Sequence, residues 1–231
     1  MPARSATRFS LRASVAVPAV VAALLSAAPT AARAAIIDPV GDFLPSYAGP
    51  KDPGLDVISA NVTLDAGQFV LTATMAGPIA PLATTVPGAL FVWGVNRGAG
   101  TQRFLLGTPS IGAGVSFDSV LVLQLTGAAA FNDLIAGTST PLAAGSVQIS
   151  GATITAELPV SLVASKGLDP REYGFNLWPR SGAGLNTQIA DFAPDASSFA
   201  ATQVPEPGSL ALLGAGMVGI AALKRRRVSP A

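Results

Sequence analysis

The sequence of 231 residues contains neither cysteine nor histidine. Without cysteine, the chain can form no disulfide and no thiolate-ligated metal site. Without histidine, it has no Ser-His-Asp triad, no Cys-His pair and no His-ligated zinc, which excludes or hinders most hydrolase mechanisms. Of the common catalytic mechanisms, those that use only carboxylates remain possible.

Charged residues are also scarce, at 12% of the chain, and they are unevenly distributed. Eight of the fourteen cations lie in the two terminal segments. The stretch between residues 35 and 208 holds the other six cations and all thirteen acidic residues, which gives it a net charge of −7. Because nucleic-acid binding requires clustered cations that neutralise phosphates, we expect no nucleic-acid partner.

The N-terminal segment combines a basic start with a short apolar run. It begins with "MPARSATRFSLR", which carries three arginines and no acidic residue, and continues with "ASVAVPAVVAALLSAA". A basic region, an apolar region and a small-residue cleavage site are typical of a secretory signal peptide. Ala32-Arg33-Ala34 fits cleavage before Ala35, so residues 1–34 are predicted to form a signal helix that signal peptidase removes, rather than a buried N-terminal helix.

The C-terminal segment has three parts: a motif, an apolar run and a cationic cluster. The motif is Val204-Pro205-Glu206-Pro207, and the chain nearly ends on Lys224, Arg225, Arg226 and Arg227. At 1.5 Å per residue, the apolar run 210–223 spans about 21 Å, less than a ~30 Å hydrocarbon core. Flanking residues can extend it, and the positive-inside rule places the cations in the cytoplasm. Residues 208–223 are therefore predicted to be a single transmembrane helix.

This order of parts resembles the PEP-CTERM sorting signal of Gram-negative bacteria. The resemblance covers about the last 28 residues, 204–231. It implies that an exosortase, a membrane-embedded and transpeptidase-like protease, recognises the tail and cuts near the Pro-Glu-Pro motif. It also implies release into the outer envelope or the extracellular polysaccharide matrix. Pro205 and Pro207 resist helix formation and would present an extended segment to the protease.

Residues 35–203 are predicted to form an all-β ectodomain, an antiparallel β-sandwich with a jelly-roll-like character. Short segments rich in β-branched and aromatic residues alternate here with glycine and proline turns. A three-residue hairpin loop is expected at 65–67, a second hairpin around Gly151 and a short helical turn within 159–166. The main predicted strands are 56–64, 68–75, 89–95, 115–125, 173–178 and 187–192.

The body also resembles domains that are attached to such sorting tails. The shared phrases are "DPVGDF", "FVWGVNRGAG", "VSFDSVLVL", "YGFNLWPR" and "IADFAPD". No activity is assigned to that group, so the resemblance implies a fold and a location rather than a chemistry.

An acidic stretch near the start of the body is a candidate metal site. Its carboxylates fall within nineteen residues and are Asp38, Asp42, Asp52 and Asp56. Calcium takes six to eight oxygen ligands in flexible geometry, which carboxylates in turns can supply. Asp191 and Asp195 would join them if the two ends of the domain meet. The alternative is that these aspartates cap turns through backbone hydrogen bonds, and their spacing matches no EF-hand.

Two other kinds of site are compatible with the sequence. Trp93, Tyr173 and Trp178 could stack on the sugar rings of a polysaccharide, although core packing is the simpler interpretation. A carboxylate pair for glycoside hydrolysis, such as Glu157 with an aspartate, needs a separation that the sequence does not define. With no histidine, no cysteine and few glutamates, we expect no enzyme. The sequence favours a structural or interaction role in the envelope or matrix, with calcium or polysaccharide binding as the alternative.

Overall fold

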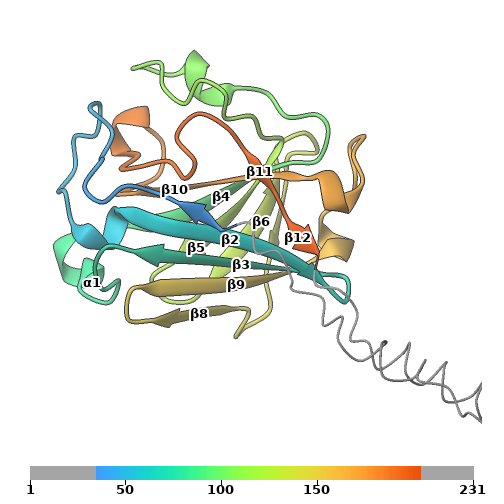
Figure 1. Cartoon of the computed structure of the whole chain (residues 1–231), viewed down its shortest axis with the longest axis horizontal. Helices are drawn as coiled ribbons and strands as arrows, with labels where there is room; N and C mark the ends of the chain where they lie inside the picture. Colours follow the sequence, from blue (N-terminus) through green and yellow to red (C-terminus); the bar gives the residue numbers. More distant parts are fainter. Residues whose placement is uncertain (1–34, 204–231) are drawn as a thin grey trace, which may run out of the picture. The chain divides into compact units, whose positions relative to one another are not determined.

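Residues 35–203, which the computed structural model describes, form two β-sheets that pack face to face (Figure 1). Sheet A runs in the order β1-β2-β3-β9-β8, and the short β12 adds to β2 in parallel. Its strands are β1 (Ile36–Ile37), β2 (Val57–Asp65), β3 (Gln68–Met75), β8 (Val147–Ser150), β9 (Thr153–Pro159) and β12 (Thr202–Gln203).

Sheet B runs in the order β11-β10-β4-β5-β6-β7 and is antiparallel throughout. Its strands are β4 (Leu90–Asn96), β5 (Ser119–Gln124), β6 (Ala129–Asp133), β7 (Thr138–Pro141), β10 (Gly174–Arg180) and β11 (Phe199–Ala200). The predicted sandwich is confirmed. Most neighbouring strands follow one another in the sequence, unlike the long crossings that define a jelly roll.

The helical elements of the body are single turns. They are η1 (Pro53–Leu55), α1 (Leu82–Thr85), η2 (Arg103–Leu106), η3 (Val160–Leu162), η4 (Pro170–Glu172) and η5 (Asn186–Gln188). The turn expected within 159–166 is η3. Within residues 35–203, no helix has the length and apolar character that crossing a membrane requires. The predicted signal helix (1–34) and transmembrane helix (208–223) lie outside the described residues.

The hairpin between β2 and β3 follows from the sequence, but its loop is shorter than predicted. Buried and partly exposed residues alternate along β3, which is the pattern of a strand with one face in the core. Asp65 pairs with Gln68, so the loop has two residues, Ala66 and Gly67, instead of three. Both have positive φ angles, 46° and 80°, as the twist of a two-residue hairpin requires.

The segment 187–192 was expected to be a strand and is not one. It begins within η5 and afterwards makes only an isolated bridge, between Ile189 and Arg180. Ile189 and Phe192 are buried against the outer face of sheet B, so their apolar character serves packing rather than strand pairing. By contrast, β6 and β7 form at a sheet edge from segments that were not among the predicted strands.

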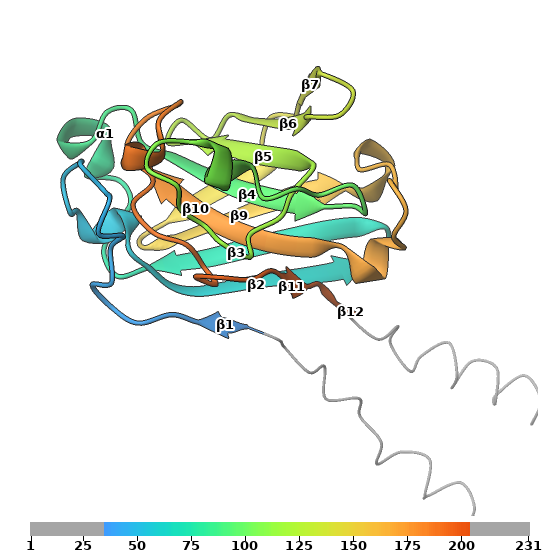
Figure 2. The same ribbon diagram turned by 90° about the horizontal axis from the view of Figure 1, so that it is seen from above.

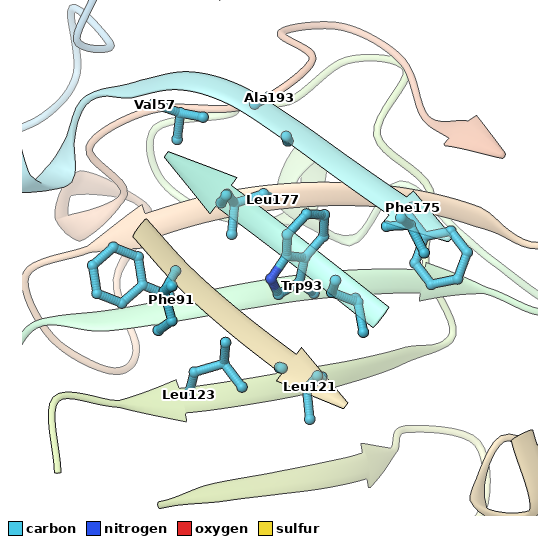
Figure 3. Packing of buried hydrophobic residues seen from close by; sticks show 14 of the residues in the cluster. Val57, Phe91, Trp93, Leu121, Leu123, Phe175, Leu177 and Ala193 are labelled. Atoms are coloured by element: carbon cyan, nitrogen blue, oxygen red, sulfur yellow. The ribbon is translucent and has the colours of Figure 1, made fainter. Parts of the chain in front are cut away.

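The core lies between the two sheets. Along β4, Phe91 and Trp93 point into it, beside Leu121 and Leu123 of β5 and residues of β10 (Figure 3). Val95 of β4 belongs to the same cluster. A second apolar cluster covers the other face of sheet B and contains Val92, Phe104, Val115, Phe117, Trp178, Ile189 and Phe192. Both faces of the central strands are therefore buried, which explains the nearly continuous apolar sequences of β4 and β10.

The two ends of the body lie along one edge of β2. Ile36 of β1 pairs with Ala60, and Thr202 of β12 pairs with Thr63, while β3 occupies the opposite edge. The two short terminal strands therefore follow one another along the same strand (Figure 2). The loop that follows β1 therefore lies beside the start of β2, whereas β12 lies beside its end.

Candidate metal centre

The loop after β1 is fixed against the start of β2 by backbone and carboxylate hydrogen bonds. The Asp38 N–H donates to the Ile58 carbonyl oxygen at 3.1 Å. The chain then turns at Gly41, whose φ angle of 84° favours glycine, and the Gly41 N–H donates to Asp56 Oδ2 at 2.8 Å. Asp38, Asp42 and Asp56 are thereby held in one region.

The loop after η5 reaches the same region from the other end of the sequence. Asp191 Oδ2 accepts a hydrogen bond from the Val57 N–H at 2.9 Å, across 134 residues of chain, and Oδ1 accepts from the Phe192 N–H at 2.7 Å. A further bond, from the Leu44 N–H to the Ala190 carbonyl oxygen, ties the two loops together at 2.8 Å. The ends of the domain therefore meet, which is the condition on which Asp191 and Asp195 were expected to join the acidic stretch.

Five aspartates form a carboxylate cluster at this meeting point. Their oxygens make two groups of three, and within each group the atoms lie no more than 4.8 Å from one another. We call Asp42, Asp56 and Asp191 the inner triad, because Asp56 and Asp191 are buried. The outer triad is Asp38, Asp42 and Asp195, and Asp195 is exposed. Asp42 belongs to both triads.

Several oxygens of the cluster are buried without a hydrogen-bond partner. They are Asp38 Oδ2, Asp42 Oδ1 and Asp56 Oδ1. Asp38 is only 8% exposed and Asp56 only 2%. Buried carboxylate oxygens are normally paired or bound to a metal, because an unpaired buried acceptor carries its full desolvation cost. The cluster therefore has the oxygen donors of a hard cation site, and three of these oxygens have no protein donor in place of a cation.

The electrostatics of the cluster agree with this view. Burial raises the pKa of Asp191 to about 8, and the nearby charges of Asp38 and Asp42 add to the effect of burial, against the Val57 N–H, which lowers it. Burial likewise raises the pKa of Asp38 to about 7, with contributions from the neighbouring carboxylates. The pKa values of Asp42 and Asp56 are raised, mainly by burial. Either protons or a cation must compensate such a cluster near neutral pH.

Asp52, the fourth predicted ligand, lies outside the cluster. Its Oδ1 accepts from the Gly54 N–H at 2.9 Å and caps η1, and its Oδ2 accepts from the Thr85 hydroxyl at 2.7 Å. This is the turn-capping role that was the alternative for the whole acidic stretch. The prediction of Asp52 as a metal ligand finds no support in the structure, because its carboxylate belongs to neither group of closely spaced oxygens.

The three aromatic residues considered for sugar stacking are buried. Trp93 and Tyr173 lie in the core between the sheets, and Trp178 lies in the cluster on the outer face of sheet B. No ring face is open to a sugar, so core packing describes all three positions. A hollow of about 430 Å³ beside residues 126–129 and 141–147 contains no aromatic lining residue and offers no stacking platform either.

Glu157, the candidate for a glycosidase pair, is exposed on β9 opposite Val70 of β3. It is not one of the five carboxylates of the cluster. The arrangement gives no support to an acid–base pair that includes Glu157.

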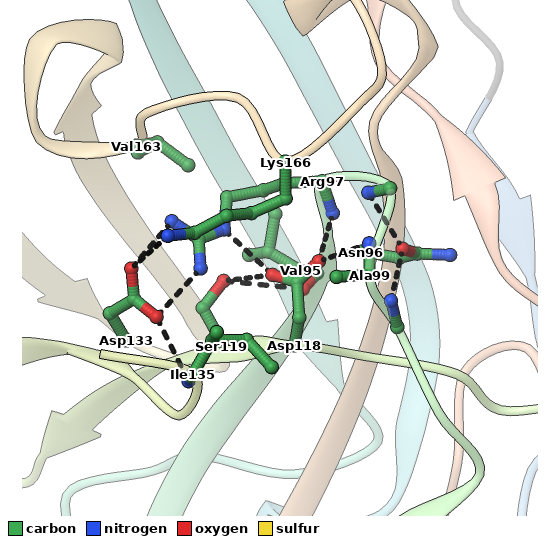
Figure 4. A network of polar contacts seen from close by, with 12 residues as sticks. Val95, Asn96, Arg97, Ala99, Asp118, Ser119, Asp133, Ile135, Val163 and Lys166 are labelled. Carbon is green, nitrogen blue, oxygen red and sulfur yellow. Dashed lines mark hydrogen bonds and ion pairs between the residues drawn. The ribbon is translucent and has the colours of Figure 1, made fainter. Parts of the chain in front are cut away.

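A second polar cluster lies at the end of β4 and is built differently. The buried Arg97 donates through Nε to Asp118 Oδ1 at 2.7 Å, and both terminal nitrogens reach Asp133 at 3.0 Å (Figure 4). Lys166 also pairs with Asp133, at 3.4 Å. The hydrogen bonds from Arg97 lower the pKa of Asp133. Here cations neutralise the acids, so this cluster is a structural network rather than a metal site. The sequence reasoning did not identify it.

A comparison with known families identifies the C-terminal segment. Residues 203–227 match the PEP-CTERM protein-sorting motif, as the resemblance in the sequence predicted. The motif implies an exported protein that an exosortase sorts at the cell surface. Its first residue, Gln203, is also the last residue of β12, so the motif follows the β-sandwich directly. No curated protein matches the chain.

Proposed function

We propose that this chain is an exported surface protein whose β-sandwich is a calcium-binding module with a structural or interaction role in the envelope or matrix, and that it is not an enzyme. The carboxylate cluster is the observation that carries the proposal. Three of its oxygens are buried without hydrogen-bond partners. The ion pairs of Arg97 and Lys166 are made with Asp118 and Asp133, which lie outside the cluster.

The dimensions of the cluster favour calcium among common divalent cations. Calcium–oxygen distances of 2.3–2.6 Å place oxygens on opposite sides of the ion up to about 5 Å apart. The oxygens of each triad lie within 4.8 Å of one another, which fits this limit. Magnesium demands near-ideal octahedral geometry and keeps most of its water, so a loose arrangement of carboxylates on loops suits it poorly.

Calcium binding should be directly measurable by isothermal titration of the purified full-length chain after chelator treatment. Replacing Asp56→Asn should weaken calcium binding by about a hundredfold or more, because one charged and buried ligand of the inner triad is lost. Asp56 Oδ2 accepts from Gly41, and asparagine can keep that bond through its own oxygen.

The matched control is Asp65→Asn, at an exposed position at the end of β2. It removes the same charge without touching the cluster and should leave the calcium affinity unchanged. Equal weakening in both variants would mean that only net charge attracts calcium, and a wild-type chain that binds none would refute the proposed function.

The tail is proposed to be removed once the protein has been sorted. We propose cleavage within or beside Val204–Pro207, after export directed by the segment 1–34 with its cleavage before Ala35. Mass spectrometry of the mature protein, isolated from the surface of the producing cell, should find a C-terminus there and lack the tail. A Glu206→Ala variant should retain the tail if the motif is read by the protease. Intact Ala231 in mature wild-type protein would contradict this proposal.

A further inference from the structure

The five carboxylates do not gather around one point. Their oxygens divide into the inner and outer triads, which share Asp42 and no other residue. An ion bound by the inner triad would not also be bound by Asp38 and Asp195, because their oxygens belong to the other group. A single ion would therefore leave two members of the cluster without a cation.

Each triad contains its own buried and unpartnered oxygen. In the inner triad this is Oδ1 of Asp56, a residue 2% exposed, and in the outer triad it is Oδ2 of Asp38, a residue 8% exposed. Asp42, whose Oδ1 is also buried without a partner, is the residue common to both triads. Each triad therefore has a buried carboxylate oxygen that requires a positive partner, and the two oxygens belong to different residues.

Resting on the proposed calcium-binding function, we propose that the carboxylate cluster is a two-ion calcium site in which Asp42 bridges an inner and an outer ion. Asp56 and Asp191 complete the protein ligands of the inner ion, and Asp38 and Asp195 complete those of the outer ion. Bridging carboxylates can serve two ions because each carboxylate has two oxygens with about four lone-pair sites.

Charge balance supports two ions over one. Five ionised carboxylates carry five negative charges, and one calcium ion leaves three of them uncompensated in a partly buried place. Two ions leave one, and the exposed Asp195 lies where water screens it. The described body has six cations and twelve acids, and two of those cations, Arg97 and Lys166, pair with Asp118 and Asp133 outside the cluster.

The two ions should differ in affinity. The inner triad includes Asp191, which is fully buried and fixed by two backbone N–H groups, so its oxygens are preorganised. The outer triad includes the exposed Asp195, and water molecules must fill several of the six to eight positions that calcium requires. We expect the inner ion to bind first and the outer ion more weakly.

The stoichiometry of calcium binding tests the inference. Equilibrium dialysis of the full-length chain with radioactive calcium should saturate at two ions per chain. Asp195→Asn should reduce saturation to one ion and change the affinity of the remaining ion by less than about tenfold. Because Asp195 is exposed, this substitution should leave the fold intact, and Asp65→Asn should keep both ions.

The outcomes separate this inference from the proposed function. One ion per chain in the wild type, unchanged by Asp195→Asn, would overturn the two-ion site and leave calcium binding standing. Loss of all calcium in Asp195→Asn would overturn the division into separate triads. No calcium bound by the wild type would overturn both. Two ions in the wild type and one in Asp195→Asn is the result that supports the inference.

Discussion

Replacing Asp118 by asparagine should destabilise the body by about 3–5 kcal/mol, because the substitution leaves a buried arginine incompletely compensated. Arg97 and Asp118 are both fully buried. Asp118 accepts from Arg97 Nε, from the Arg97 backbone N–H at 2.8 Å and from the Ala99 N–H at 3.1 Å (Figure 4). An amide group would place a donor against at least one of these donors, so the loss is larger than that of one hydrogen bond.

Urea denaturation of the full-length chain measures this effect, and thermal melting checks it. For a body of this size each kcal/mol lowers the Tm by about 2–4 °C, so a fall of about 10 °C is expected. Asp65→Asn, at an exposed position, should change stability by about 0.5 kcal/mol or less. If Asp118→Asn unfolded at the wild-type urea concentration, the network would contribute little to stability.

Calcium should raise the melting temperature strongly above neutral pH and little in mild acid. Burial raises the pKa of Asp191 to about 8 and that of Asp38 to about 7, against a value of 3.8 for the free side chain. Between pH 4 and about 8 the folded calcium-free protein therefore holds protons that the unfolded chain releases. The stability that Asp38 and Asp191 contribute is therefore greatest below that window and is lost as the pH rises through it. Calcium replaces those protons, so its effect grows with pH.

The measurement compares melting with excess calcium and with chelator, at about pH 5 and about pH 8.5. A ligand at about a hundred times its Kd adds about 2.7 kcal/mol. That corresponds to about 5–10 °C in Tm for a body of this length. The difference should be close to zero at the lower pH. A calcium effect of equal size at both pH values would mean that the cluster is not where calcium acts.

The strands that the sequence predicted best are those with one clearly buried face. In β3 the alternation is complete, and its predicted bounds, 68–75, match the structure. The strands β6 and β7 consist largely of small and polar residues, "AAFND" and "TSTP", and lie at an edge, so no periodicity marks them. Segment 187–192 shows the opposite case: its apolar residues pack against sheet B, but the segment makes only an isolated bridge to β10 and forms no strand.

The sequence predicted that aspartates would form the cluster, but it did not predict which aspartates would meet. The density of aspartates at 38–56 indicates a candidate metal site, with turn capping as the alternative, and Asp191 and Asp195 join it only if the ends of the domain meet. Whether they contribute depends on a contact across 134 residues, between Asp191 and Val57, which no local pattern encodes. Likewise, nothing in the sequence distinguishes Asp52 from Asp56. Both oxygens of Asp52 accept hydrogen bonds, from Gly54 and Thr85, whereas Asp56 Oδ1 is buried without a donor.

The pairing of β1 and β12 with the same strand has a consequence for the order in which the protein folds. Chains are made and delivered from the N-terminus, so β2 arrives long before β12. The Thr202 hydroxyl donates to the Val62 carbonyl oxygen across 140 residues. The part of the β2 edge at Thr63 and Leu64 can therefore pair only after the last residues of the body are present, so the pairing of β12 is a late step in folding.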